Sequence, residues 1–472
     1  MNISKNLCVI IFGLSLLFSI AIYSTSLDYY FFQDDFFEIN ISKASNLGDY
    51  LNFYKFRNDI IAYRPISLQN YFFFSQSVFG LNPVGFRFIT FTLFILSAAL
   101  ISKVAYQITK NSKMGLLTAS FWVFSSIHFM SLTWIAAAYN IIGTFFYLLT
   151  TFLFLNFLEK KRGKFLFLSL LSYLVTIGSF EFSVTWPLIL GFYCLTIARV
   201  KFIKILKIFL PYVVISLIYL ALRTFLIKVP QITEYKLAFN IDSIKALIWY
   251  FLWTFNIPEE FKKQAFRFII ILRGKFLADY WLLVSVTTIS TLGILLLGII
   301  QPALRYLKSK NGIGKKIILF CMVWFLVGIF PVLLLPNHTF TMYLTLSSIG
   351  LYMCLSYFLI ANSKKFVIFS VLGLFITSSI FTLNFYKSNS WMIYSQKFSQ
   401  DFAIGIKNSH PFLPSNSAVF YPLQESRNKQ SLLFSEALKA VYNDSTLTIY
   451  YNKSELIQDA RRGVNKQIYF YP

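Results

Sequence analysis

The sequence predicts an all-α polytopic membrane protein with about eleven transmembrane helices and a small outer α/β domain at its C-terminal end. Three observations predict this class. Only 13% of the 472 residues are charged, whereas a soluble domain carries about 25%. Hydrophobic residues make up 57% of the chain, and the mean hydropathy is +0.63. Long apolar runs follow one another along the chain, and every second gap between them is basic.

The apolar runs are long enough to cross a bilayer, because a spanning helix needs about 20 mostly apolar residues. The first run follows Lys5 and lacks a small-residue cleavage site, so we expect a retained anchor rather than a signal peptide. The eleven runs lie at 7–27, 84–108, 115–133, 137–157, 165–180, 184–198, 208–228, 280–300, 317–335, 340–360 and 366–384.

Lysine and arginine cluster in every second gap, and this sets the expected orientation. Such residues gather on the cytoplasmic side of a membrane. We therefore expect a cytoplasmic N-terminus in a plasma (inner) membrane, with residues 28–82, 229–279 and 386–472 outside. The basic gaps hold Lys110 and Lys113, Lys160 to Lys164, Arg199 to Lys207, Arg305 to Lys316, and Lys364 with Lys365, and the gaps near 128–134, 181–182 and 337–339 hold no Lys or Arg.

Two units are expected from the distribution of the apolar runs. Residues 1–385 contain all of them and form the transmembrane unit. In residues 386–472 the long runs stop. There, 417–421 and 446–451 have the pattern of short strands, and 431–442 that of a helix. We expect these elements to form the small outer domain.

The outer loop 229–279 has two features of a membrane-surface segment. Residues 244–255 are rich in Trp, Tyr and Leu, which indicates a helix lying in the interface. Arg267, Arg273 and Lys275 could bind an anionic lipid headgroup of a substrate, or they could be plain contacts with the membrane surface.

Composition and motifs exclude several other classes. The net charge of +24 does not indicate nucleic-acid binding, because the cytoplasmic gaps account for the basic residues and no basic stripe on a soluble domain remains. Cys8, Cys194, Cys321 and Cys354 all lie in apolar runs without a CxxC pattern, so neither a disulfide framework nor a zinc site is supported. Residues 312–316 lack the spacing of a P-loop.

An acidic cluster opens the outer loop 28–82. Asp34 and Asp35 are adjacent, and Glu38 follows. Carboxylates this close raise each other's pKa, and they suit a general base or a cation site, with Asp35 as the ligand if a divalent cation is bound. Aromatic residues flank the pair on both sides, which favours a partly desolvated site. The alternative is a solvated loop start.

Four further polar residues near the outer ends of the spans are candidate substrate contacts. Arg64 can bind phosphate at two points or anchor the loop to lipid headgroups. Glu181 and Asn140 either line a substrate path or simply lie in the outer interface. His338, in an outer turn, either meets a phosphate or carboxylate or is a surface residue. Arg87, which begins the second span, is expected to be an interfacial anchor.

Several short motifs occur in a fixed order on the expected outer side, and together they resemble the GT-C superfamily of membrane glycosyltransferases. This superfamily includes the protein O-mannosyltransferases and the aminoarabinose transferases. The resemblance covers roughly residues 7–360. The matching motifs are Asp34-Asp35, then Tyr63-Arg64-Pro65-Ile66 with Phe79 to Pro83 and Arg87, then Trp134 to Asn140, and finally Ser179-Phe180-Glu181 with Trp186-Pro187-Leu188.

Three basic residues of the family's motifs are missing. Ala138 stands where the family has an arginine, and Phe180 stands where it has a lysine. The segment that begins at His338 also lacks its arginine. The resemblance therefore leaves the mode of phosphate binding open.

The resemblance implies transfer of a sugar from a polyprenyl-phosphate donor, held among membrane lipids, to a hydroxyl of a protein, lipid or glycan acceptor. Asp34 would take the proton of that hydroxyl, whose oxygen attacks the anomeric carbon with inversion. Asp35 would position the acceptor or a divalent cation. Arg64 and His338 would stabilise the leaving phosphate, and Glu181 would line the site.

Two other functions compete with this one. A polysaccharide polymerase or glycan flippase also handles lipid-linked sugars, but a flippase carries charged residues within its spans, and nearly none occur here. A polymerase would carry paired arginines in large mid-chain outer loops, and Arg267 with Arg273 matches this pattern only thinly. A non-enzymatic presenter of residues 386–472 would tolerate changes at the first-loop carboxylates.

Overall fold

In the computed structural model of this chain, the structure describes residues 4–57, 60–227, 233–266, 271–272, 274–307, 312–362, 364–462, 464 and 466–471. Most of them are helical. The longer helices are α1 (Lys5–Tyr23), α5 (Pro83–Thr109), α6 (Ser112–Phe124), α8 (Tyr139–Lys160), α9 (Gly163–Ile177), α10 (Trp186–Thr196), α11 (Phe202–Leu226), α12 (Ile241–Trp253), α15 (Trp281–Ile294), α17 (Gly312–Leu333), α18 (Leu344–Asn362), α19 (Lys365–Asn389) and α20 (Trp391–Ser409).

Shorter elements connect these helices and build the rest of the chain. The short helices are α2 (Asp34–Ile41), α3 (Leu47–Asn52), α4 (Tyr71–Phe79), α7 (Phe129–Thr133), α13 (Glu260–Gln264), α14 (Gly274–Asp279), α16 (Gln301–Leu307), α21 (Ser426–Ser431), α22 (Glu436–Tyr442) and α23 (Lys453–Arg461). The 3₁₀ and π turns are η1 (Ser24–Ser26), η2 (Ile66–Asn70), η3 (Ser126–His128), η4 (Ile135–Ala138), η5 (Glu181–Thr185), η6 (Thr233–Tyr235), η7 (Leu295–Ile300) and η8 (Thr341–Tyr343). The strands are β1 (Ala265–Phe266), β2 (Ile271–Leu272), β3 (Ala418–Phe420), β4 (Thr448–Tyr450) and β5 (Ile468–Phe470).

The predicted count of eleven transmembrane helices is not confirmed. Among the described residues, eight helices are long and apolar enough to cross a membrane, or nine if α6 and the η3–α7 segment, bent by 52°, form one span. The runs at 165–180 and 184–198 became α9 and α10, with 15 and 11 residues, fewer than the roughly 20 that a straight crossing needs. The chain is nevertheless an integral multi-pass membrane protein, as the sequence predicts.

Local signals explain where the spans begin. Ser4 caps α1 by accepting a hydrogen bond from the Leu7 backbone N–H at 3.2 Å. Asn82 caps α5 in the same way, 3.0 Å from the Val84 N–H, and Pro83 follows at the first helical position. Proline fits there because its missing N–H would have no partner within the helix.

The helices of the bundle pack in a tight core, partly through small residues. Helix α8 packs against α5 and α9, α6 against α5, and α18 against α17 and α6. A Cβ atom on Gly350 would lie 2.4 Å from the Cys321 carbonyl oxygen of α17. Small residues at such crossings let two backbones approach closely, which is the main means of helix association in a membrane.

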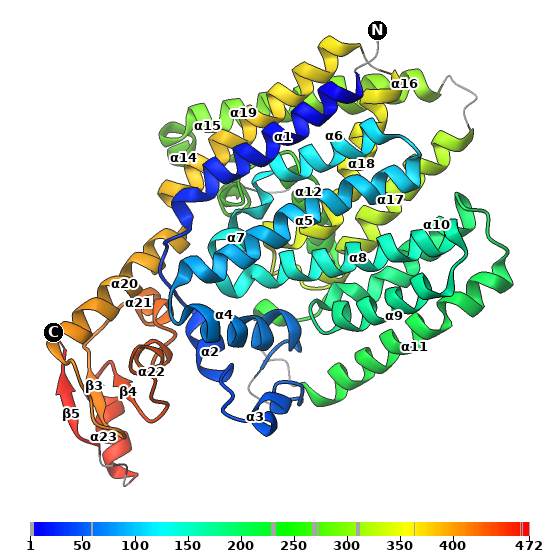
Figure 1. The fold of residues 1–472 in the computed structure, drawn as a ribbon. Coiled ribbons are helices and arrows are strands. Elements are labelled where there is room, and N and C mark those ends of the chain that lie inside the picture. The colour runs from blue at the N-terminus through cyan, green and yellow to red at the C-terminus, as the bar shows by residue number, and fades with distance from the viewer. Residues whose placement is uncertain are drawn as a thin grey trace.

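The first outer loop and the C-terminal segment lie together at one end of the bundle, and the N-terminus lies at the other (Figure 1). The C-terminal segment begins with α20, which continues α19 beyond a break at Ser390. Its three-stranded parallel sheet has the order β4-β3-β5. Strands β3 and β4 fall within the two stretches that the sequence marks as strands, whereas β5 was not expected. Helix α22 occupies most of the expected helix.

We expect Gly350→Ala to lower the free energy of unfolding by about 1–3 kcal/mol, because the new methyl group forces α17 and α18 apart. The measurement is the melting temperature of purified protein in detergent. Gly373→Ala in α19 is the matched control, since a Cβ there meets nothing within 4 Å. Equal melting temperatures for the two variants would contradict the close α17–α18 contact.

Candidate functional site

The acidic cluster of the first outer loop forms the start of α2. Asp34 and Asp35 lie in the first turn, where the positive end of the helix dipole favours carboxylates. The residue before them, Gln33, has φ 52° and ψ −127°, a conformation that L-residues rarely adopt. Such a backbone costs about 1–3 kcal/mol and persists only when the surroundings hold it.

Asp35 is fully buried and engaged with the backbone. Its two oxygens accept hydrogen bonds from the N–H groups of Phe32 at 3.1 Å and Ala136 at 2.6 Å. Burial raises the pKa of Asp35 to about 7, although these bonds and the charge of Arg87 oppose the shift. Asp35 therefore fastens the first outer loop to the turn η4.

Arg87 is not the interfacial anchor that the sequence predicts. Its side chain is 1% exposed. The guanidinium donates to the Thr133 carbonyl from Nε at 3.1 Å and Nη2 at 2.8 Å, and to the carbonyls of Leu27 and Tyr29 from Nη1. The prediction is wrong because Arg87 lies on the face of α5 that is turned into the protein, where its guanidinium meets two other loops rather than lipid headgroups.

Asp34 differs from Asp35 in its exposure and in its hydrogen bonding. Its side chain is exposed to water, and among the described residues its carboxylate forms no hydrogen bond and no ion pair. Protein atoms nevertheless surround it closely, and this partial desolvation raises its pKa to about 6. Glu38 lies one turn further along α2, and burial together with the charge of Asp34 raises the pKa of Glu38 to about 8. The acid that remains accessible is therefore Asp34.

Arg64 and Glu181 form an ion pair between segments that are far apart in the sequence. Arg64 Nε lies 2.7 Å from Glu181 Oε2, and the two side chains are 16% and 14% exposed. The guanidinium carbon also lies 3.5 Å from the centre of the Tyr139 ring. Burial alone would lower the pKa of Arg64, but the Glu181 carboxylate and Tyr139 raise it, so the guanidinium stays charged. The ion pair uses Nε of Arg64 and not its two terminal nitrogens, Nη1 and Nη2.

Tyr235 and His338 join Asp34 and Arg64 in one region. Burial raises the pKa of Tyr235, and the charges of Asp34 and Arg64 act on it in opposite directions. The His338 ring lies 4.7 Å from that of Tyr235 and 6.0 Å from that of Tyr343. Burial and the Arg64 charge lower the pKa of His338 to about 4, so this histidine is neutral near pH 7. We call Asp34, Arg64, Tyr235 and His338 the Asp34–Arg64 site.

The remaining predicted contact residues are Asn140, Arg267, Arg273 and Lys275. Asn140 is fully buried and donates to the Ala137 carbonyl at 3.1 Å, so it holds the turn that leads into α8. Arg267 and Arg273 lie outside the described residues. Lys275 is exposed on α14. The sequence-derived set also lacks Tyr235, which no motif marks, although aromatic residues beside Arg and carboxylates are frequent in binding sites.

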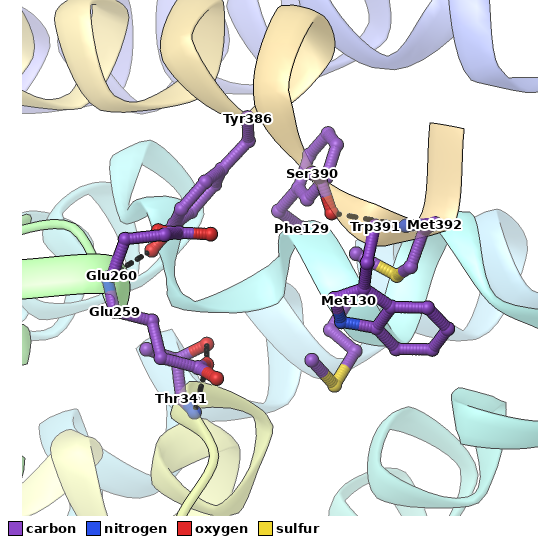
Figure 2. Close-up of a pocket in the computed structure, with 9 residues that line it drawn as sticks. All are labelled: Phe129, Met130, Glu259, Glu260, Thr341, Tyr386, Ser390, Trp391 and Met392. Carbon is purple, nitrogen blue, oxygen red and sulfur yellow. Dashed lines mark hydrogen bonds between the residues drawn. The ribbon is translucent and has the colours of Figure 1, made fainter. Parts of the chain in front are cut away.

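A second acidic pair lines a small cavity beside the break between α19 and α20. Glu259 and Glu260 lie on one side of it and Trp391 on the other (Figure 2). The cavity measures about 10 Å³, the room of about one water molecule. Glu259 Oε2 accepts from both the N–H and the hydroxyl of Thr341, at 3.0 and 3.1 Å. The contact between Glu259 and Thr341 ties the loop after α12 to η8.

Aromatic rings connect this cavity to the first outer loop. The Trp391 ring lies 5.4 Å from Trp134 and 5.9 Å from Phe32, and Phe32 and Trp134 stack at 6.0 Å. In the described part of the chain, no three His, Cys, Asp or Glu side chains converge as a metal site would need. A divalent cation at Asp35 stays a prediction.

We expect Asp35→Ala to lower the free energy of unfolding by about 2–4 kcal/mol, because it leaves two buried N–H groups without an acceptor. Asp34→Ala removes no hydrogen bond and should stay within about 0.5 kcal/mol of wild type. Melting temperatures of the two variants at one pH test this contrast. A similar loss for both would mean that Asp34 also holds the fold.

No protein-family model matches the chain, and no curated protein matches it by sequence. Its structure is similar to the Archaeoglobus fulgidus oligosaccharyltransferase in the apo form, with a TM-score of 0.49 and 11% identity over 94% of this chain. It is also similar to ArnT from Cupriavidus metallidurans bound to undecaprenyl phosphate, with a TM-score of 0.48 and 10% identity over 97% of this chain.

The two matches differ in length. The chain spans 64% of the archaeal protein and 89% of ArnT. Likeness at this level of identity does not extend to substrates or to individual residues.

Proposed function

We propose that this protein transfers a sugar from a polyprenyl-phosphate donor to an acceptor hydroxyl, with inversion, at the outer face of a membrane. One observation carries the proposal. Asp34 is an accessible carboxylate without a hydrogen-bond or ion-pair partner among the described residues. It shares its surroundings with Arg64, whose guanidinium is fixed in place by an acid and an aromatic ring. A base and an anion-binding group on one site are what glycosyl transfer from a phosphate requires.

Asp34 is the general base in this proposal. A base works best when its pKa lies near the operating pH, and the pKa of Asp34 is about 6. The carboxylate takes the proton of the acceptor hydroxyl as the oxygen attacks the anomeric carbon. The bond between that carbon and the phosphate oxygen breaks, and the polyprenyl phosphate leaves with the electron pair. Asp35 does not act as the base in this proposal, because it is fully buried and holds two backbone N–H groups.

Arg64 stabilises the phosphate as its negative charge grows. Its Nε is occupied by Glu181, so the terminal nitrogens are left for the two-point contact that guanidinium groups make with phosphate. His338 is neutral near pH 7 and contributes a hydrogen bond rather than a charge. Arg64 thereby supplies the positive charge for which the family's motifs have three further basic residues that this chain lacks.

Glu38 affects the charge balance of the site. Its pKa of about 8 keeps it protonated at neutral pH. No second negative charge then lies one helical turn away from Asp34. Gln69 donates a hydrogen bond to Glu38 Oε2 at 3.3 Å, which fixes the side chain. Protonated Glu38 leaves Asp34 as the charged acid on this face of α2.

We expect Asp34→Asn to lower the transfer rate by at least about 100-fold, because asparagine cannot take a proton. The assay is transfer in membranes from a panel of radiolabelled polyprenyl-phosphate sugars to endogenous acceptors. Asp49→Asn is the control and should keep wild-type activity, because this half-buried acid of the same loop accepts hydrogen bonds from Ser45 and Asn46 and lies outside the Asp34–Arg64 site. Full activity of Asp34→Asn would remove this residue from the mechanism. No transfer by wild-type protein from any donor would reject the proposed function.

The rate of transfer should rise with pH as Asp34 ionises. With a pKa of about 6, roughly one tenth of the carboxyl is ionised at pH 5 and nine tenths at pH 7. We therefore expect kcat/KM to increase about ten-fold between these values and then level off. The donor phosphate does not titrate in this range. A flat profile from pH 5 to 7 would show that the base is not a carboxyl with a raised pKa.

A further inference from the structure

The helix that carries Asp34 is held by the other end of the chain. In residues 391–471, the C-terminal segment, α22 packs against α2, and α20 packs against α21 and α22 (Figure 1). The backbone N–H of Tyr30 donates to Gln396 Oε1 at 3.1 Å. The N–H of Gln33 donates to the Ser431 carbonyl at 2.9 Å. These two bonds bracket the segment that leads into α2.

The Ser431 carbonyl is a rigid acceptor. The residue is fully buried. Its carbonyl also accepts from the Ser399 hydroxyl at 2.9 Å, and its own hydroxyl lies 3.0 Å from that of Ser395. Both serines belong to α20, which continues the long helix α19 out of the bundle. The bond from Gln33 to Ser431 therefore connects the first outer loop to the bundle through α20, in addition to the connection that Asp35 makes to η4.

Gln33 is the residue that needs such support. Its positive φ places it in a backbone conformation that only external contacts maintain, and it immediately precedes Asp34. The direction in which α2 leaves Gln33 sets where the Asp34 carboxylate lies. The Ser431 carbonyl thus fixes the backbone at Gln33, the residue whose conformation sets the position of the Asp34 carboxylate.

A side-chain contact fastens the far end of the same helix. Asn40 Nδ2 donates to Glu436 Oε2 at 2.7 Å and to the Glu436 carbonyl at 3.0 Å. Glu436 begins α22, and its other carboxylate oxygen pairs with Lys439 at 2.6 Å. Both ends of α2 are accordingly bound to the C-terminal segment, one through Gln33 and one through Asn40.

We propose that the C-terminal segment positions the base: it holds α2 so that Asp34 meets the acceptor hydroxyl, and Asn40 and Glu436 are positioning residues for this purpose. The catalytic consequence rests on the proposed function. The mechanical coupling between α2 and the C-terminal segment does not.

The first measurement is amide hydrogen exchange of the full-length protein, followed in peptides that cover residues 30–42. Asn40→Ala and Glu436→Ala should speed exchange in these peptides, because the first removes both hydrogen bonds from Asn40 to α22 and the second removes the one to the carboxylate. Glu436→Gln keeps an acceptor oxygen for Asn40 and should exchange like wild type. Lys439→Ala is the matched control, since it removes the ion pair on α22 without touching α2. Melting temperatures of all variants identify any that fail to fold.

The second measurement is steady-state transfer by the same variants. Displacing a base by a fraction of an ångström lowers the rate of the chemical step while leaving donor binding intact. We expect Asn40→Ala and Glu436→Ala to lower kcat about 10- to 100-fold with KM for the donor unchanged. The double variant should have the same kcat as the less active of the two single variants. Glu436→Gln and Lys439→Ala should keep the wild-type kcat.

Each result decides the proposal. Unchanged exchange in residues 30–42, or faster exchange with unchanged kcat, overturns it. A rise in KM alone also overturns it, since that would place the contact in substrate binding. If wild-type protein transfers no sugar, the proposed function fails, and exchange alone then decides whether the C-terminal segment holds α2.

Discussion

The arrangement of the loops around Asp34 depends on one buried guanidinium. Arg87 donates to carbonyls of the first outer loop and of α7, while Asp35 accepts from N–H groups of the same loop and of η4. Each side chain satisfies backbone groups that would otherwise be buried without partners. Buried polar groups are tolerated only when they are hydrogen-bonded. Here these hydrogen bonds fix two loops against the start of α5.

This arrangement separates two tasks within one acidic dipeptide. Asp35 holds the loop in place, and Asp34 is left exposed to water with a raised pKa. Adjacent residues of a helix point in different directions, so a single turn directs one carboxylate inward and the other outward. The chemistry that we assign to Asp34 therefore relies on its neighbour being unavailable for it.

The sequence predicts the class of fold well and the internal contacts of the site poorly. Apolar length and basic gaps are local signals, and each of the eleven runs is helical. Local signals also place β3 and β4, whereas β5, with three residues beside the chain end, has too little pattern to stand out. The bend after α6 and the shortness of α9 and α10 follow from packing within the bundle, which hydropathy does not report.

The candidate residues divide along the same line. The Asp34-Asp35 motif and Arg64 were found from their types and neighbours. Their division of labour, and the pairing of Arg64 with Glu181 across 117 positions, depend on tertiary contacts that no single segment encodes. Arg87 was misjudged for this reason. In sequence, an arginine at the start of a span looks like an interfacial anchor whether its side chain meets lipid or protein.

The bond between Gln33 and Ser431 has a consequence for biosynthesis. Gln33 leaves the ribosome long before its partner Ser431, because the transmembrane helices lie between them in the chain. Until Ser431 has been translated, Gln33 lacks the acceptor that holds its strained backbone. The nascent chain thus carries an incompletely supported acidic loop while those helices are made.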